Sequence, residues 1–184
     1  MPAVEMEIQM ATRKAAATPR RSARRQPDAL RMLKDDHDKV KDLFEKFKSS
    51  RSDDKKGELA QTICKELTVH THLEEEIFYP AVREAIDDDD TMNEAIVEHA
   101  SAKELIAAIE KMSPDDEMFD AKVVVLGEFV NHHIREEQNQ MFPQVRKTDL
   151  DLNDLAEQMR ARKRELTGEE GADEDAASQA RANA

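Results

Sequence analysis

The chain has 184 residues, a net charge of −13, one cysteine and 4% aromatic residues, which suits one domain with tails. The negative charge argues against a nucleic-acid-binding protein, which needs a basic face, and Cys64 alone cannot form an intrachain disulfide. No apolar run approaches the roughly 20 residues that span a bilayer, and the N-terminal residues contain no apolar core of the kind found in a secretory signal, so we expect a cytoplasmic protein.

Residues 1–27 are expected to form a disordered basic arm. Between Arg13 and Arg25 they carry arginine and lysine among Ala, Thr, Ser and Pro, without any acid. Such a composition cannot bury enough apolar surface to fold. A weak tether to nucleic acid or another acidic surface and an organelle transit peptide are the alternatives, and Glu5 and Glu7 weaken the second.

The first helix is predicted to begin near Pro27-Asp28, with an acid in its first turn. Spacings of three and four residues then define one stripe. It contains Leu33, His37, Val40, Phe44 and Phe47. Residues 49–54 are expected to form the turn to the next helix.

The second helix carries a stripe of Leu59 or Ile63, Leu67, His70, Glu74 and Ile77. Pro80 should bend or loosen the helix near its end. His72 lies about 200° round the helix from His70 and should face away from the core. Glu75 and Glu76 fall off the stripe and are expected to be solvated, and Cys64 is interpreted as a buried filler and not a nucleophile.

Two further helices complete the pattern. Residues 87–90 form an acidic connection whose last residues cap the third helix, and Ser113-Pro114-Asp115-Asp116 is predicted to start the fourth. The third-helix stripe contains Met92, Ile96 or Ala95, His99, Ala102, Ile106 and Ile109. The fourth-helix stripe contains Val123, Leu126, Val130, His133, Glu137 and Met141.

Four long amphipathic helices with short connections predict an all-α protein, an antiparallel up-down-up-down four-helix bundle over residues 28–148. Residues 149–184 are expected to add a short fifth helix around Leu152, Leu155 and Met159, packed on the outside. The Ala-, Gly- and acid-rich stretch from residue 167 onward predicts a disordered acidic tail.

One motif occurs twice, as His70-xxx-Glu74 and as His133-xxx-Glu137, each followed by an aromatic residue and a proline. Residues four apart lie on one helix face, so each copy aims an imidazole and a carboxylate in one direction. A further histidine precedes each copy: His37 by 33 residues and His99 by 34. His132 would repeat the spacing of 33, but only His133 keeps the distances to Glu137 and the proline. His132 is therefore interpreted as a flanking residue or as support for the site from outside.

A single histidine on an apolar stripe is usually a core residue with a hydrogen-bond partner. Here four stripes carry one, and two of them also carry a glutamate. Burying these carboxylates costs several kcal/mol each unless their charge is compensated, and no Lys or Arg on the stripes can do so. Cations between the helices would supply the charge.

Four imidazoles and two carboxylates exceed what one tetrahedral zinc needs, and the ligand types suit iron. They fit two iron ions, each with two imidazoles and with both carboxylates bridging. That count leaves positions for an oxo or hydroxo bridge and for one small ligand. The predicted metal ligands are His37, His70, Glu74, His99, His133 and Glu137.

These motifs resemble the hemerythrin-like, HHE cation-binding family over about residues 28–148. The resemblance implies a four-helix bundle that holds a non-heme di-iron centre through the same six residues. Oxygen-carrying hemerythrins are similar but have a second histidine one turn after the third-helix histidine, where this chain has Lys103. The chain looks closer to the four-His, two-Glu branch, which the family associates with nitric-oxide and oxidative-stress responses, iron-sulfur repair or sensing.

The first functional hypothesis is a non-heme di-iron protein that binds or responds to O2, NO or peroxide, with redox activity toward peroxide or NO left open. The second is an iron store, donor or sensor whose tails bind a protein partner. The third is a structural zinc bundle without redox chemistry. No membrane partner is expected.

Overall fold

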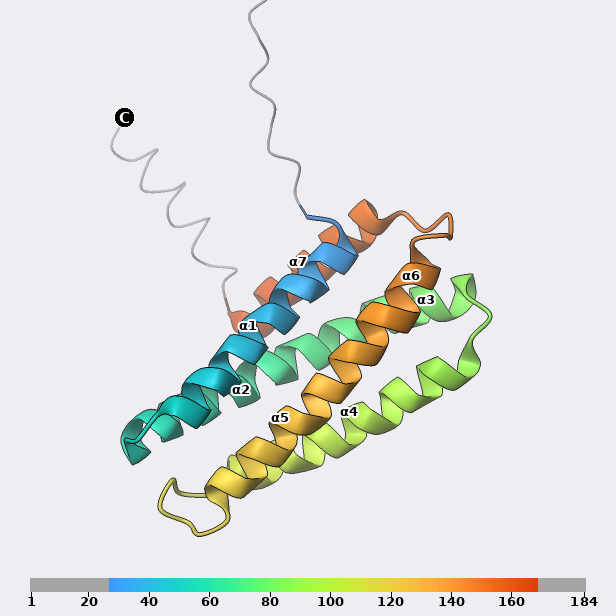
Figure 1. The fold of residues 1–184 in the computed structure, drawn as a ribbon. Coiled ribbons are helices and arrows are strands. Elements are labelled where there is room, and N and C mark those ends of the chain that lie inside the picture. Colours follow the sequence, from blue (N-terminus) through green and yellow to red (C-terminus); the bar gives the residue numbers. More distant parts are fainter. Residues whose placement is uncertain (1–26, 169–184) are drawn as a thin grey trace, which may run out of the picture.

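The structure, a computed structural model, describes residues 27–168, and within this range it contains helices and no strand. Four helical columns run antiparallel, and a further helix lies against one side (Figure 1). The elements are α1 (Ala29–Ser49), α2 (Asp53–Leu73), η1 (Glu74–Phe78), α3 (Tyr79–Ala85), α4 (Asp89–Ile109), α5 (Phe119–Glu136), η2 (Glu137–Met141), α6 (Phe142–Val145) and α7 (Leu152–Thr167). The predicted all-α four-helix bundle is confirmed. The predictions of a disordered arm and a disordered tail concern residues that lie outside the described range.

Short polar residues cap the N-terminal ends of α1, α2 and α4. Asp28 caps α1 by accepting a hydrogen bond from the Arg31 N–H, so it precedes the first turn and does not belong to it. Ser52 and Asp88 cap α2 and α4 in the same way. The turn between α1 and α2 is therefore shorter than predicted and comprises residues 50–52.

The fourth column begins at Phe119, so the prediction of a helix start at Ser113-Pro114-Asp115-Asp116 is wrong. The Asp116 carboxylate accepts from the Ser113 N–H, and the Asp116 carbonyl accepts from the Phe119 N–H, which makes two successive turns. Pro114 packs against α2 so closely that a Cβ atom at Gly57 would lie 2.8 Å from its Cγ. This contact with another helix holds the segment in a loop.

Each long column that contains a glutamate of the repeated motif widens by one residue at that glutamate. The Tyr79 N–H donates to the Glu74 carbonyl, five residues back, and the Phe142 N–H donates to the Glu137 carbonyl. Pro80 and Pro143 follow and lack the N–H that a regular α-helical turn would use, so the loosening expected near Pro80 is a π-helical turn.

The extra residue in the π turn shifts the buried face. Phe78, which the predicted stripe did not include, is fully buried, whereas Ile77 is half-buried and packs at the edge of the same cluster. In α4 the apolar stripe contains Ala95 and not Ile96, because Ala95 is buried and Ile96 is exposed.

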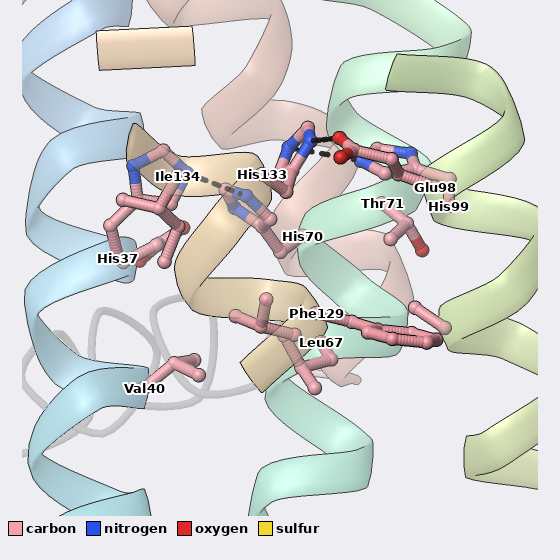
Figure 2. A pocket seen from close by; sticks show the side chains of 13 residues that line it. His37, Val40, Leu67, His70, Thr71, Glu98, His99, Phe129, His133 and Ile134 are labelled. Carbon is pink, nitrogen blue, oxygen red and sulfur yellow. Dashed lines mark hydrogen bonds and ion pairs between the residues drawn. The ribbon is translucent and has the colours of Figure 1, made fainter. Parts of the chain in front are cut away.

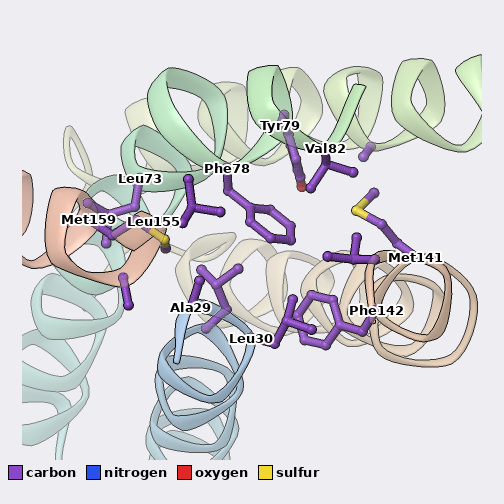
Figure 3. Packing of buried hydrophobic residues seen from close by; sticks show 14 of the residues in the cluster. Ala29, Leu30, Leu73, Phe78, Tyr79, Val82, Met141, Phe142, Leu155 and Met159 are labelled. Atoms are coloured by element: carbon purple, nitrogen blue, oxygen red, sulfur yellow. The ribbon is translucent and has the colours of Figure 1, made fainter. Parts of the chain in front are cut away.

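The apolar core consists of two clusters, one on each side of a polar layer. The first cluster joins the start of α1 to η1, α3, η2, α6 and α7 and includes Leu30, Phe78 and Phe142 (Figure 3). The second joins the remaining parts of α1, α2, α4 and α5 and includes Phe44 and Leu126. Each long column passes from one cluster to the other through a histidine, so the histidine layer is sealed by apolar side chains at both ends.

The predicted fifth helix is α7, and its apolar side belongs to the first cluster. Leu155, Ala156 and Met159 are buried in that cluster. Lys163 forms an ion pair with Asp36 of α1, and Arg162 forms one with Glu76 of η1. None of the described helices combines the length and the apolar character that a membrane crossing requires.

Candidate metal centre

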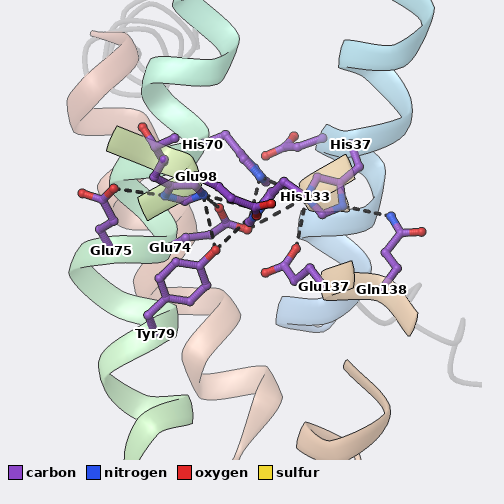
Figure 4. Close-up of polar contacts among 12 residues, drawn as sticks. His37, His70, Glu74, Glu75, Tyr79, Glu98, His133, Glu137 and Gln138 are labelled. Carbon is purple, nitrogen blue, oxygen red and sulfur yellow. Dashed lines mark hydrogen bonds and ion pairs between the residues drawn. The ribbon is translucent and has the colours of Figure 1, made fainter. Parts of the chain in front are cut away.

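All six predicted ligand residues meet in the polar layer between the two apolar clusters (Figure 4). Each is at most 7% exposed. The imidazoles come one from each long column, and the carboxylates begin the two π turns. The six are His37, His70, Glu74, His99, His133 and Glu137.

The imidazoles form two pairs, and Glu74 lies between them. The Nε2 atoms of His37 and His70 are 3.0 Å apart, and those of His99 and His133 are 3.3 Å apart. Glu74 Oε1 lies 3.2 Å from His70 Nε2, and Glu74 Oε2 lies 3.2 Å from His99 Nε2. Each pair together with Glu74 makes a group whose donor atoms all lie within 4.8 Å of one another. Glu137 Oε2 extends the first group, 3.3 Å from His37 Nε2.

Among the described residues the two buried carboxylates form ion pairs only with imidazoles, and no lysine or arginine compensates their charge. All four oxygens of Glu74 and Glu137 are buried without a hydrogen-bond partner among the described residues. Burial raises the pKa of Glu137 well above its usual value, and the charge of Glu74 adds to this shift. Burial also acts on Glu74, but the neighbouring His70 and His99 hold its pKa well below the usual value. Burial, with the charge of His70, lowers the pKa of His37 and favours the neutral imidazole that binds metals. The donor set fits two cations.

Three residues outside the six orient the imidazoles through their second nitrogen, and sequence reasoning missed all three. Glu75 Oε1 lies 3.0 Å from His99 Nδ1, and Glu98 Oε2 lies 2.9 Å from His133 Nδ1. The Gln138 amide lies 2.9 Å from His37 Nδ1. Such partners fix the ring and increase its donor strength. The second pair has carboxylate support on both rings, whereas His70 Nδ1 has no partner among the described residues.

The prediction that Glu75 is solvated is therefore wrong. Its carboxylate is half-buried between His99 and Lys103, whose Nζ lies 2.5 Å from Oε2. Glu75 follows Glu74 by one helix position, which points it sideways toward α4 and not outward. Lys103 reaches the rim of the site through this glutamate.

Tyr79 is a further residue that the sequence analysis did not assign to the site. Its hydroxyl lies 3.3 Å from His99 Nε2 and 3.5 Å from His133 Nε2. Burial, together with the charge of Glu74, raises the pKa of Tyr79 well above its usual value, so the phenol keeps its proton. The repeated motif could have indicated this residue, because both copies have an aromatic residue directly before the proline. That residue is Tyr79 in one copy and Phe142 in the other. Phe142 stacks on His37 as Tyr79 packs on His99.

The remaining candidate residues lie where the sequence predicts. His72 is half-buried, with its Nδ1 2.9 Å from the Glu76 carboxylate, and it lies outside the imidazole layer. His132 is exposed, and its Nε2 lies 3.4 Å from both Glu98 and Glu136. Cys64 is buried, and burial followed by the charge of Glu110 raises its pKa to about 11. A thiol with this pKa in this position fits a filler of the core.

A small, mainly apolar cavity of about 30 Å³ adjoins the four imidazoles (Figure 2). This volume is enough for one molecule of the size of water. Its floor is formed by the imidazoles, and its walls are mainly apolar. The wall residues include Val40, Leu67, Ala102, Phe129, Val130 and Ile134.

Glu75→Gln and Glu98→Gln should each weaken metal binding by about 10- to 100-fold, because each removes the carboxylate that supports one imidazole of the second pair. Competition with a chromophoric chelator measures this affinity. Glu76→Gln is the matched control, since Glu76 is the next carboxylate in the same segment but contacts only His72 and Arg162. Equal affinities for all three variants would contradict the supporting role.

Fold and site together define a helical-bundle protein that binds metal cations. The model of the hemerythrin HHE cation-binding domain matches residues 28–145. The chain therefore belongs to the hemerythrin HHE cation-binding domain family.

Two individual similarities accompany the family match. A protein of Nostoc sp. (strain PCC 7120 / SAG 25.82 / UTEX 2576) named "DNA nickase" is 35% identical over 119 residues, which are 65% of this chain and 33% of that protein. This chain thus spans about a third of that relative, whose name describes that protein alone. The crystal structure of a hemerythrin HHE cation-binding domain-containing protein from Mycobacterium kansasii has a TM-score of 0.66 at 23% identity and covers 78% of this chain and 90% of the other. This likeness confirms the fold.

Proposed function

We propose that the chain holds two iron ions and binds a small uncharged ligand, such as O2, NO or hydrogen peroxide, in a stress-response or sensing role. One ion would be held by His37, His70, Glu137 and one oxygen of Glu74. The other would be held by His99, His133 and the second oxygen of Glu74. Bound iron would supply Lewis acidity and electrons, which the side chains lack.

The observation that carries this proposal is the apolar cavity on the imidazole layer. The four imidazoles line a space that accepts one small molecule, and the carboxylates of Glu74 and Glu137 lie against the same imidazoles. No lysine or arginine of the described residues lines the cavity, and most of its wall residues are apolar, so an uncharged ligand suits it best. The two apolar clusters limit access of water to the layer, and Tyr79 offers a protonated hydroxyl beside the second imidazole pair.

Iron is preferred over zinc because of the number and kind of donors. A structural zinc site is four-coordinate and closed, whereas six imidazole and carboxylate residues here surround two positions and adjoin a cavity. The alternative of an iron store or donor that acts through its tails stays a prediction, because the tails lie outside the described residues.

Metal analysis and spectroscopy test the proposal. Protein made in iron-replete cells should contain about two iron ions per chain. After anaerobic reduction, addition of O2, NO or hydrogen peroxide should change the optical absorption of the iron, because the ligand enters the coordination sphere. His72→Ala, which alters a histidine outside the layer, is the control and should behave like the natural chain. Zinc in place of iron, or an optical spectrum that none of the three ligands changes, would contradict the proposal.

A further inference from the structure

A second group of candidate ligands lies on the outer face of α4 and α5. The donor atoms of Glu94, His132 and Glu136 lie within 4.8 Å of one another. His132 Nε2 is 3.4 Å from Glu136 Oε1 and 3.4 Å from Glu98 Oε1. We refer to Glu94, Glu98, His132 and Glu136 as the outer cluster. It combines two i, i+4 pairs, one on each of two antiparallel neighbours, so both helices present their donors to one point.

No lysine or arginine within residues 27–168 forms an ion pair with the carboxylates of the outer cluster. The other i, i+4 histidine–glutamate pair outside the buried layer differs in this respect. There Glu76 accepts from Arg162 at 2.7 Å and 3.2 Å while it contacts His72. In the outer cluster the carboxylate charge is not compensated by a lysine or arginine of the described residues, so a bound cation could compensate it. An imidazole with several carboxylates suits first-row divalent ions such as Fe²⁺, Mn²⁺ and Zn²⁺.

The outer cluster is connected to the buried centre. Glu98 contacts the exposed His132 with one oxygen and the buried His133 with the other. A small cavity of about 10 Å³ lies between Glu98, Glu136 and Glu137. Glu137, at the inner side of this cavity, is 2% exposed, and neither of its oxygens has a hydrogen-bond partner among the described residues. Carboxylates thus follow one another from the surface to the buried Glu137 carboxylate of the centre.

We propose that the outer cluster is a separate site for a hydrated divalent cation, and that Fe²⁺ binds there before it moves inward to the buried centre. Side chains supply three or four donors, and water completes the coordination, so the ion stays exchangeable. The inward step rests on the proposed function, since it requires the buried centre to take up iron. Binding at the outer cluster does not depend on that function. No oxidation or bond cleavage is involved.

Binding of Mn²⁺ tests the outer site by itself. Protein is first filled with two Zn²⁺ per chain, and exchangeable Zn²⁺ is removed from the surface by desalting. It should then bind one further Mn²⁺ per chain, seen as the loss of the free-ion signal in electron paramagnetic resonance. Glu94→Gln and His132→Ala should remove this Mn²⁺. His72→Ala should keep it, because it alters the pair that Arg162 already neutralises. Unchanged Mn²⁺ binding in both outer variants would overturn the site.

Loading kinetics test the inward step. Metal-free protein is mixed anaerobically with Fe²⁺, and a chelator added at increasing times removes the iron that has not reached the buried centre. His132→Ala and Glu94→Gln should slow loading about tenfold, within the range by which acidic surfaces raise cation on-rates, and should still reach about two ions per chain. Loading as fast as in His72→Ala would overturn the inward step. Failure of the natural chain to retain iron would instead contradict the proposed function, while the Mn²⁺ result would still stand.

Discussion

Glu74→Gln is expected to remove cations from both halves of the centre. Each oxygen of Glu74 faces a different imidazole pair, at 3.2 Å from His70 and 3.2 Å from His99. Glutamine keeps the shape but loses the charge and leaves one oxygen in place of two. Removing one partner of a buried charge pair costs about 3–5 kcal/mol, which corresponds to roughly 100- to 4,000-fold in metal affinity. Elemental analysis after desalting should therefore fall from about two ions per chain to less than one.

Matched variants show whether this loss reflects bridging. Glu137→Gln should lower metal content less than Glu74→Gln, because Glu137 lies beside His37 of the first pair. His72→Ala should leave metal content unchanged. Two ions retained by Glu74→Gln, or equal losses in all three variants, would contradict the placement of Glu74 between two cations.

Removal of the metal is expected to lower the melting temperature of the protein by about 15–30 °C. The buried carboxylates of Glu74 and Glu137 have no hydrogen-bond partner among the described residues, so the cations would provide their compensation. An ion present at a thousand times its dissociation constant stabilises the folded state by about 4 kcal/mol, or about 8 kcal/mol for two ions. In a chain of this size each kcal/mol shifts the melting temperature by about 2–4 °C.

Differential scanning calorimetry with and without a strong chelator measures this shift. The effect of the chelator should disappear in Glu74→Gln, which has little metal to lose. A natural chain whose melting temperature the chelator leaves unchanged would show that the centre does not couple metal binding to folding.

The duplicated hairpin and the six residues of the buried layer could be predicted because both depend on local geometry. The 3.6-residue period places His37, His70, His99 and His133 on apolar faces, and the i, i+4 rule places each glutamate beside its histidine. These relations hold within one helix and need no knowledge of its neighbours. The same reasoning placed His72 and His132 outside the layer, and the structure agrees.

The start of the fourth helix could not be predicted in this way. The residues at Ser113 satisfy every local rule for a helix start, yet Pro114 contacts α2 at Gly57 and the segment forms turns. The burial of Phe78 beyond Glu74 was likewise missed, because the π turn adds a residue that a regular period does not contain. In both cases the prediction used the regular period and end signals of a single helix, and the structure departs from them.

The sequence by itself determined the helices, their inward faces and the imidazole and carboxylate donors, since side chains on one helix are related by a constant rotation per residue. The tertiary structure decided which residues from different helices meet. It brought Glu75 to His99, Glu98 to His133 and the Tyr79 hydroxyl to the second imidazole pair. These contacts depend on how the helices are packed against one another, and the period of a single helix contains no information about that packing.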